Sequence, residues 1–294
     1  MTFKIITDST SDLSEEWAKK NDVLILGLTI EIEGRNYETT GAKKISSQEL
    51  IKKMSEAHTP KTSQVSIGKF FEYFLKIVET GEDILCITLS SVLSGTYQSA
   101  VMAKEMVLEK YPKAKINIID SFTASGGEGY LVVKANQLKR EGLNLKETTT
   151  EIEQIQKKIH TYFLVDDLKH LMRGGRLSKT SALIGSIVNI KPIITISENG
   201  TLIAHSKVRG KKKAIQTLID LANITQPYEK IVLAYNGPLE DIKGIINTLK
   251  KEDNKIDIMV VELGPVISTH VGPNTIALFR IKKTIDKKDK NIVE

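Results

Sequence analysis

Apolar runs alternate with amphipathic stretches through the first half of the chain. The runs rich in Ile, Val and Leu predict strands at Phe3–Thr7, Val23–Ile32, Ile84–Thr88 and Lys115–Asp120. Apolar residues recur with the helical period at Leu50–Ala57, Ile67–Glu79, Gly95–Glu109 and Gly126–Arg140. Strands that are apolar throughout and alternate with helices predict a parallel sheet covered by helices on both faces.

The pattern changes after about residue 160, where hairpin signals replace the regular alternation. Asn199-Gly200 separates two apolar runs and predicts a tight hairpin, because both turn positions of such a hairpin favour a positive φ. Strands are predicted at Ile193–Ser197, Thr201–Ser206, Lys230–Tyr235, Ile256–Glu262 and Thr275–Ile281, and helices at Lys211–Ala222 and Leu239–Lys250. This combination predicts a mixed sheet with helices on one face. We therefore expect two α/β domains, residues 1–160 and residues 161–294.

The composition is that of a globular protein without a membrane-spanning segment. The chain has 294 residues, of which 40% are hydrophobic and 27% are charged. No stretch approaches the ~18 apolar residues that a spanning helix needs, and the N-terminus enters a strand pattern without the apolar core of a signal peptide. The single cysteine, Cys86, lies in an apolar run, so no disulfide framework is expected. These features predict a cytoplasmic protein.

The net charge of +6 is modest and unevenly distributed. One basic cluster comprises Arg209 and Lys211–Lys213, and another lies at 282–290, where Asp286 and Asp289 interrupt the lysines. Nucleic-acid binding would require aromatic residues among the basic ones or a recognisable module. Aromatic residues make up only 5% of the chain and no such module occurs, so we expect no nucleic-acid partner.

Turns rich in serine and threonine follow the predicted strands or precede the predicted helices. They lie at 8–12, 62–66, 90–96 and 120–127. The carboxyl ends of parallel strands and the N-termini of the following helices meet at one edge of a sheet, where ligands bind. Serine and threonine are common helix N-caps, so one such turn alone indicates only capping. Several together, with hydroxyls and free helix N–H groups, indicate a site for an anion.

Two chemical roles are open to Ser94. The chain order Ser94, then Asp166 or Asp167, then His270 is that of the α/β-hydrolases. A nucleophile elbow needs small residues on both sides of its serine, however, and Leu93 directly precedes Ser94. A phosphate-binding loop is disfavoured because no G-x-x-x-x-G-K-[ST] sequence occurs. The pattern favours a neutral hydroxyl donor, and a serine hydrolase that cleaves an ester through Ser94 and His270 is the alternative.

A segment after the predicted domain boundary combines an acidic pair with two arginines. Asp166 and Asp167 are suited to cap a short helix that Gly174-Gly175 ends. Arg173 and Arg176 flank the glycines and are able to reach anionic oxygens. No histidine or glutamate stands at a spacing that would complete a metal site with the aspartates, so we predict no metal.

Two later segments add to the candidate site. The apolar stretch 181–190 contains Ala182 and Gly185, whose small size suits either a packed core or the lining of a tunnel. The stretch 262–273 is rich in glycine and proline and predicts a loop. Its single histidine, His270, is either structural or a ligand contact.

A series of short motifs occurs in chain order: IITDSTSDL, KTSQVS, ITLSSVLSGTYQSA, LMRGGRLSK, VRGKKKAI and GPVISTHVGP. Together they resemble the DegV family, the fatty-acid-binding subunits of bacterial fatty acid kinase, over nearly the whole chain. The resemblance implies a two-domain DegV-type fold. An N-terminal α/β domain with a parallel sheet would precede a C-terminal two-layer α/β domain with a mixed sheet, which would form the lipid tunnel.

The resemblance also implies a function. A long-chain fatty acid would lie with its carboxylate between the domains and its tail in the tunnel, and no cofactor would be needed. A separate ATP-dependent kinase subunit would phosphorylate the carboxylate, which gives an acyl phosphate for phospholipid synthesis. The chain itself would be a carrier rather than an enzyme, and a transient membrane contact is compatible with this role. An interaction module that acts only through residues 209–213 is a further alternative.

The family motifs imply roles for individual residues. The residues that match the carboxylate-binding positions are Thr62, Ser94 and His270. Arg173 matches the arginine that assists phosphoryl transfer. Further expected contributors are the nearby polar turn residues Ser63, Gly95, Thr96 and Ser125, the partner-docking residues Arg209, Lys211 and Lys212, and the tunnel-lining residues Leu183, Ile184 and Ile187.

Overall fold

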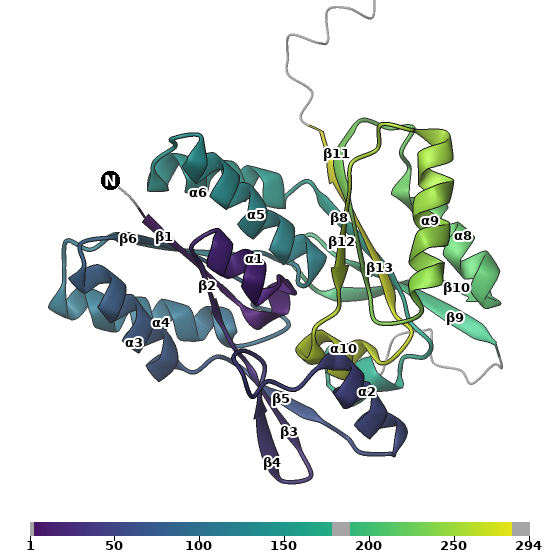
Figure 1. The fold of residues 1–294 in the computed structure, drawn as a ribbon, viewed down its shortest axis with the longest axis horizontal. Helices are drawn as coiled ribbons and strands as arrows, with labels where there is room; N and C mark the ends of the chain where they lie inside the picture. Colours follow the sequence, from purple (N-terminus) through teal and green to yellow (C-terminus); the bar gives the residue numbers. More distant parts are fainter. Residues whose placement is uncertain (1–2, 178–188, 284–294) are drawn as a thin grey trace, which may run out of the picture.

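A parallel sheet forms the centre of the first half of the molecule (Figure 1). The computed structural model describes residues 3–177 and 189–283. The strand order is β2 (Val23–Leu26), β1 (Phe3–Asp8), β6 (Asp83–Thr88) and β7 (Ile116–Asp120), and all neighbours run parallel. Helices α3 (Ile67–Glu79) and α4 (Thr96–Lys110) cover one face, and α1 (Glu15–Lys20), α5 (Gly126–Arg140) and α6 (Leu145–Gln156) cover the other. The prediction of a parallel sheet with two covered faces is confirmed.

Each central strand of this sheet contributes to two cores, because successive side chains of a strand point to opposite faces. Ile5 and Leu85 pack with α5 and α6, whereas their neighbours Ile6 and Cys86 pack with α3 and α4. All of these side chains are at most 1% exposed. A strand buried on both faces has no solvent-facing positions for polar residues, which explains the continuous apolar runs in the sequence.

The predicted strand Val23–Ile32 is wrong in its length, because the chain leaves the parallel sheet at Gly27. Here the backbone passes so close to Thr40 that a Cβ on Gly27 would lie 2.6 Å from Thr40 Oγ1. The continuation pairs in a small antiparallel sheet whose order is β4 (Arg35–Glu38), β3 (Thr29–Ile32) and β5 (Lys61–Ser63). Helix α2 (Ser47–Ser55) lies between β4 and β5 in the chain.

A mixed sheet forms the second half of the molecule. Its strand order is β10 (Leu202–Arg209), β9 (Ile190–Ile196), β8 (Ile159–Leu164), β13 (Ile276–Lys282), β11 (Tyr228–Tyr235) and β12 (Ile258–Glu262). Neighbours are antiparallel except for β11 and β12, so the prediction of a mixed sheet is confirmed. Helices α8 (Lys211–Ala222) and α9 (Leu239–Glu252) cover one face. Two short helices, α7 (Lys169–Arg173) and α10 (Pro265–Val271), contact each other beside this sheet.

The hairpin between β9 and β10 forms as predicted, but its turn is not the expected two-residue turn. The loop runs over residues 197–201, and Gly200 N donates to Ser197 O at 2.9 Å. Gly200 has a φ of 81°, whereas Asn199 does not have a positive φ. A longer loop of this kind needs only one left-handed position, which the glycine supplies.

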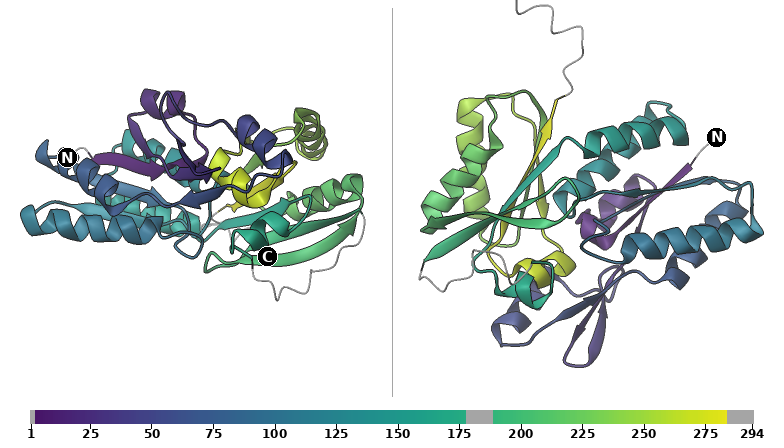
Figure 2. Two further views of the ribbon diagram at one scale, coloured as in Figure 1. Left: turned by 90° about the horizontal axis from the view of Figure 1, so that it is seen from below. Right: turned by 180° about the vertical axis from the view of Figure 1, so that it is seen from behind.

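Helix α5 lies between the two larger sheets (Figures 1 and 2). One hydrophobic cluster contains Leu131 and Val132 of this helix together with Leu85 of β6 and Phe279 of β13. The two halves of the chain therefore share a core in addition to the cores that each has to itself. The division of the chain into domains at residue 160 stays a prediction.

Candidate functional site

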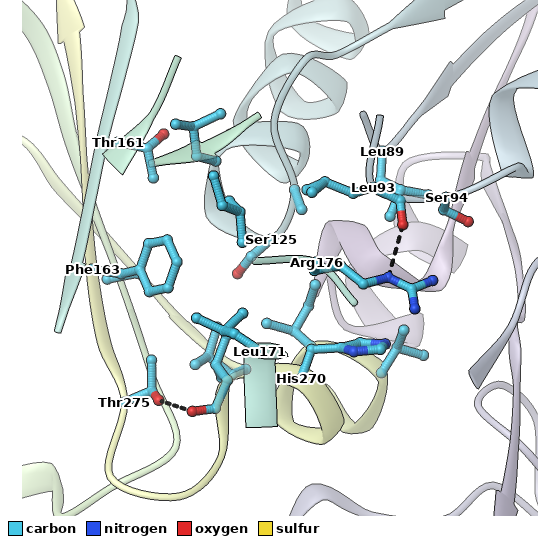
Figure 3. A pocket seen from close by; sticks show the side chains of 18 of the residues that line it. Leu89, Leu93, Ser94, Ser125, Thr161, Phe163, Leu171, Arg176, His270 and Thr275 are labelled. Carbon is cyan, nitrogen blue, oxygen red and sulfur yellow. Dashed lines mark hydrogen bonds between the residues drawn. The ribbon is translucent and has the colours of Figure 1, made fainter. Parts of the chain in front are cut away.

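A cavity lies between the two larger sheets, beside the carboxyl edge of the parallel sheet (Figure 3). The empty space between its walls is about 750 Å³ when the open solvent at its mouth is counted, and the centre of a water-sized sphere can occupy about 90 Å³ of it. The first half of the chain contributes Leu28, Thr62, Leu89, Leu93, Ser94, Ala124 and Ser125 to the lining. The mixed sheet contributes Thr161, Phe163, Ile196, Leu202, Ala277 and Phe279. Helices α7 and α10 and the adjoining turns contribute Leu171, Arg176, Leu263, Val266, Ile267, His270, Val271 and Thr275.

Most of this lining is apolar, and four polar side chains gather on one side of it. Figure 3 shows Ser94, Arg176 and His270 on that side of the cavity, opposite Phe163. Thr62 joins them through its contact with His270. We refer to Thr62, Ser94, Arg176 and His270 as the polar cluster. An apolar cavity with a few convergent polar groups is the usual form of a small-molecule site.

Thr62 and His270 form the closest contact in the polar cluster. Thr62 Oγ1 lies 2.8 Å from His270 Nε2. Burial, and to a smaller degree the charge of Arg176, lowers the pKa of His270 to about 4, so the imidazole is neutral at neutral pH. His270 Nδ1 is buried and has no hydrogen-bond partner within the described ranges. Buried N–H groups without an acceptor are rarer than unpaired acceptors, so we assign the proton to Nε2, and the hydroxyl proton of Thr62 remains available to a ligand.

His270 lies on a helix, so the predicted loop at 262–273 is wrong for the residues of α10. Pro265 takes the first helical position, where the missing N–H of proline costs no hydrogen bond within the helix. Gly272 ends the helix with a φ of 78°. The glycines and the proline that suggest a loop in the sequence are therefore the boundaries of a short helix.

Helices α7 and α10 are fixed to each other by two reciprocal contacts between a glycine and a histidine. A Cβ on Gly174, which ends α7, would lie 2.3 Å from His270 Nδ1. A Cβ on Gly272, which ends α10, would lie 2.5 Å from His170 Cδ2. Neither position has room for a side chain. Gly174 thereby fixes the imidazole that contacts Thr62.

The hydrogen bonds of Ser94 are those of a turn rather than of a catalytic triad. Ser94 Oγ lies 3.0 Å from Thr96 Oγ1 and accepts from Thr96 N at 3.3 Å. His270 Nδ1, which the carboxylate of a triad would contact, has no such partner in the described part of the chain. Asp166, one of the two expected carboxylates, instead pairs with Lys191 and accepts from the amide of Asn274. These contacts favour a hydroxyl donor over a nucleophile.

Arg176, and not Arg173, lines the cavity. Arg173 is exposed and donates to Thr59 Oγ1 at 3.2 Å. Arg176 is half-buried, and its Nε donates to Leu93 O at 3.0 Å, directly before Ser94. Burial lowers the pKa of Arg176, but an arginine stays protonated in a protein. The sequence contained this signal, because both arginines of the RGGR motif were candidates for contact with an anion.

The residues predicted for the nearby polar turn are partly brought together. Gly95 and Thr96 lie at the start of α4, next to Ser94. A Cβ on Gly95 would lie 2.1 Å from Gln64 Oε1, so a side chain here would displace the amide of Gln64. Ser125 precedes α5 and lines the cavity. Ser63 is exposed at the end of β5 and does not line the cavity.

The predicted docking residues lie at the junction of β10 and α8. Arg209 and Lys212 are exposed there, and Lys211 forms an ion pair with Asp241. None of these basic side chains lines the cavity. The predicted tunnel residues Leu183, Ile184 and Ile187 lie outside the described residues.

The turn after β1 joins two separate parts of the cavity wall. Asp8 Oδ2 accepts from Leu89 N at 3.1 Å, and Thr10 O accepts from Ser125 N at 2.7 Å. Leu89 and Ser125 both line the cavity. The turn that follows β1 therefore holds two residues of the cavity wall in position through their backbone N–H groups.

A buried acidic cluster, which we define as Asp8, Asp12 and Glu128, lies behind this wall. Burial raises the pKa of Asp8 to about 6 and that of Asp12 to about 7, and it raises the pKa of Glu128 well above its usual value. The carboxyl oxygens of Glu128 lie 2.9 Å from the hydroxyl oxygens of Thr7 and Thr10. Sequence reasoning missed Glu128, because it is 118 residues from Thr10 along the chain.

Two features of other protein classes do not occur in the ranges 3–177 and 189–283. No group of three or more His, Cys, Asp or Glu side chains in these ranges is arranged to hold a metal ion. No helix in them is both long and apolar enough to cross a membrane.

Comparison with known families identifies one match that covers nearly the whole chain. The model of the DegV family, described as an uncharacterised protein family, matches residues 2–283. A DegV domain-containing protein of Streptococcus pyogenes serotype M1 is 45% identical over 286 residues, which cover 96% of this chain and 98% of that protein.

Solved structures show the same fold. A structure described as showing fatty acid binding by a DegV family protein of Thermus thermophilus has a TM-score of 0.87 and 28% identity, with 96% of this chain and 100% of that chain covered. A stearic-acid-binding protein of Eubacterium ventriosum also has a TM-score of 0.87, with 27% identity and coverage of 96% of this chain and 99% of that chain. Both agree with the arrangement of a parallel-sheet domain and a mixed-sheet domain.

Proposed function

The chain belongs to the DegV family, and we propose that it binds a long-chain fatty acid in the cavity between its two larger sheets. Relatives with solved structures are described as fatty-acid-binding proteins, which supports the same ligand class here. The observation that carries the proposal is the absence of a carboxylate partner for Arg176 among the described residues. The half-buried cation of Arg176 faces an apolar cavity, and no Asp or Glu of the described residues pairs with it. A buried charge is normally paired, and a ligand carboxylate would supply the missing anion.

The polar cluster offers several donors to a carboxylate. A guanidinium has five N–H donors, and backbone carbonyls of Leu93 and Gly174 engage two N–H groups of Arg176. With the His270 proton assigned to Nε2, Thr62 accepts from the imidazole and its own hydroxyl proton is available to the carboxylate. The hydroxyl of Ser94 is a further donor. We assign the carboxylate to Thr62, Ser94 and Arg176, with His270 as the residue that orients Thr62.

The apolar part of the cavity suits the hydrocarbon tail. Phe163, Leu171, Ile196 and Ile267 are among the side chains that line it. Burial of an acyl chain contributes ~0.8 kcal/mol per CH₂, which amounts to about 10 kcal/mol for a long chain. The tail therefore supplies most of the affinity, and the polar cluster fixes the direction of binding.

We assign the chemical step to a separate ATP-dependent kinase. One carboxylate oxygen of the bound fatty acid would attack the γ-phosphorus of ATP, the bond to the bridging oxygen of ADP would break, and an acyl phosphate would form for phospholipid synthesis. The exposure of Arg173, three residues before Arg176, supports its proposed role in phosphoryl transfer. The exposed Arg209 and Lys212, together with Lys211, are the proposed docking residues.

Binding measurements on delipidated protein test the head-group assignment. Arg176→Met is expected to weaken oleate binding by at least about tenfold, because a hydrogen bond to a charged group contributes roughly 1.5–3 kcal/mol. Isothermal titration calorimetry gives the affinities. Arg140→Met, which removes an exposed arginine at the end of α5, is the matched control and should bind as the wild type does. Equal affinity of wild type and Arg176→Met would remove the proposed ion pair.

The kinase partnership needs a separate assay. A purified bacterial fatty acid kinase with ATP should produce acyl phosphate from the loaded protein, which hydroxylamine traps as the hydroxamate. Arg173→Met should lower this rate without loss of oleate, and Arg209→Glu should raise the concentration of carrier needed for half-maximal rate. If a kinase that is active with other carriers produced no acyl phosphate from this protein, the partnership would be contradicted. The proposal that the protein binds a fatty acid would not be affected.

The hydrolase alternative makes the opposite prediction for Ser94. A catalytic serine would react with a fluorophosphonate and would turn over esters until replaced by alanine. We expect neither labelling nor turnover, because His270 contacts Thr62 and has a pKa of about 4, which makes it a weak base. Stoichiometric labelling of Ser94 would contradict the carrier function.

A further inference from the structure

On the two central strands of the mixed sheet, β8 and β13, the lining of the cavity stops at a common level within the described residues. Along β13 and the residue before it, Thr275, Ala277 and Phe279 line the cavity, as expected for alternate residues on one face of a strand. The next residue on that face, Ile281, is fully buried but does not line the cavity. On β8, Phe163 and Thr161 stand opposite Ala277 and Phe279. Within the described ranges, the lining on these two strands therefore ends at Phe279 and Thr161.

Strand β13 runs from the end of helix α10 toward this level, along the wall of the cavity that carries Phe163 (Figure 3). Thr275 donates to Val271 O at 3.3 Å and to Gly272 O at 3.2 Å, so it is attached to the end of the helix that carries His270. Phe279 follows four residues later, which at ~3.3 Å per residue is about 13 Å farther along the strand. An acyl chain whose carboxylate lies at the polar cluster and whose tail follows β13 would reach Phe279 with its methyl end.

Phe279 cannot move away from such a tail, because the start of α5 supports its ring. A Cβ on Gly126 would lie 2.9 Å from Phe279 Cε2 and 2.7 Å from Val232 Cγ1. A Cβ on Gly127 would lie 3.0 Å from Phe279 Cδ1 and 2.6 Å from Thr123 Oγ1. The ring is thus in contact with the α5 backbone at two successive glycines, and Phe279 is only 2% exposed.

We propose that Phe279, supported by Gly126 and Gly127, sets the longest acyl chain that the cavity admits. This inference rests on the proposed function. A chain that ends before the ring gains affinity with each added methylene, at roughly fourfold per CH₂. A longer chain has to push the ring against a close-packed helix or leave part of its tail folded, and its affinity stops rising. The protein should therefore show a break in the dependence of affinity on chain length.

Two substitutions on the two sides of this contact are expected to move the break in opposite directions. Phe279→Leu removes ring atoms from the end of the cavity, so the break moves to longer acids, with about a fourfold gain for the first added methylene. Gly127→Ala adds a methyl group behind the ring. The interior is close-packed, so the displaced ring moves into the unfilled space of the cavity, and the break moves to shorter acids.

The measurement is the affinity of delipidated protein for saturated fatty acids of stepwise length, from laurate to arachidate. Gly244→Ala in α9, where a Cβ meets no atom within 4 Å, is the matched glycine control. Phe74→Leu is the matched phenylalanine control, because Phe74 is fully buried in a core cluster that does not include Phe279. Both controls should keep the wild-type break. If Gly127→Ala does not fold, Phe279→Trp replaces it, because the larger ring should also move the break to shorter acids.

Opposite shifts of the break support the inference, because general destabilisation would weaken all chain lengths alike. The inference would be overturned if Phe279→Leu and the variant that crowds the cavity both kept the break of the wild type. It would also be overturned if both variants moved the break in the same direction. Wild-type protein that binds no fatty acid of any length would instead contradict the proposed function itself.

Discussion

Thr10 contacts two buried carboxyl groups with a single hydroxyl proton. Its Oγ1 lies 2.5 Å from Asp8 Oδ1 and 2.9 Å from Glu128 Oε2. One hydroxyl donates one hydrogen bond, so one of the two carboxyl groups must itself be a donor. Asp8 also accepts from two backbone N–H groups, of Thr10 and Leu89, which suits its ionised form. We infer that Glu128 is protonated and donates to Thr10, which donates to Asp8.

Glu128→Gln should therefore stabilise the protein at alkaline pH. The amide keeps a donor for Thr10 and an acceptor for Thr7 but does not titrate. The pKa of Glu128 is raised in the folded state, so the contribution of this group to stability is present at low pH and is lost as the pH rises toward that pKa. The free energy of unfolding of Glu128→Gln relative to the wild type should therefore increase as the pH rises above the usual range of a glutamate.

Urea denaturation at several pH values gives this difference. Glu153→Gln on the exposed face of α6 is the control and should show no growing difference. A variant that is less stable than the wild type by the same amount at every pH would mean that Glu128 is ionised throughout. The pKa values of Asp8 and Asp12 are raised to about 6 and about 7, so these groups also lower the free energy of unfolding as the pH rises toward those values. Both the wild type and the variant show this decline.

At the scale of single residues, the sequence predicted which residue types form the site, but where two residues of one type lie close together it did not predict which of them lines the cavity. Arg173 and Arg176 are equivalent in the RGGR motif, and only the turn at Gly174 and Gly175 directs Arg176 to the cavity. No sequence pattern indicated that Glu128 is buried beside the site, because its partners Thr7 and Thr10 lie in a distant part of the chain.

At the scale of elements, amphipathic helices were predicted well because their pattern is local. The bounds of α3, α5 and α8 are those that the apolar period predicts. The break between β2 and β3 was missed because the apolar run continues through Gly27, and the close approach of Gly27 to Thr40 is a tertiary contact that no local pattern shows. Helix α10 was missed because it is short, lies between two glycines, and consists mostly of proline, serine and β-branched residues. Packing against α7 overrides their low helix propensity.

The contact between α7 and α10 can be tested through Gly174. Gly174→Ala should displace His270, whose Nδ1 would lie 2.3 Å from the new Cβ, and the loss of its contact with Thr62 should weaken oleate binding about tenfold. If Gly174 acts through His270, the same substitution should have little further effect in a His270→Ala background.

This double-mutant cycle is measured by oleate titration, with Gly244→Ala in α9 as the glycine control. Additive losses from Gly174→Ala and His270→Ala would mean that the glycine matters for the fold of α7 and not for the position of the imidazole. The Nε2 and Nδ1 chemical shifts of His270 provide an independent measure of its tautomer.

At the scale of the whole molecule, the cavity is built from both halves of the chain. Thr62 and Ser94 come from segments before residue 160, and Arg176 and His270 come from segments after it. A ligand that contacts both sets would link the two sheets across the core that they share around α5. Sequence motifs indicated this arrangement only through the family resemblance, because no local pattern specifies how two sheets face each other.

Ligand removal should consequently lower the stability of the whole molecule in one transition. Oleate at one hundred times its dissociation constant is expected to raise the free energy of unfolding by about 2.7 kcal/mol relative to delipidated protein. Thermal unfolding followed by circular dichroism measures the shift. Oleyl alcohol, which lacks the carboxylate, should stabilise less at equal concentration, and equal stabilisation by the two lipids would contradict the role of Arg176.

The most direct measurement is the identification of whatever occupies the cavity of the protein as it is purified from a bacterial host. Denaturing extraction followed by mass spectrometry, with native mass spectrometry for stoichiometry, determines the bound lipid. We expect one long-chain fatty acid per chain, and its loss from Arg176→Met on dilution. Protein that carries no fatty acid and that also fails to take up oleate or palmitate after delipidation would contradict the account.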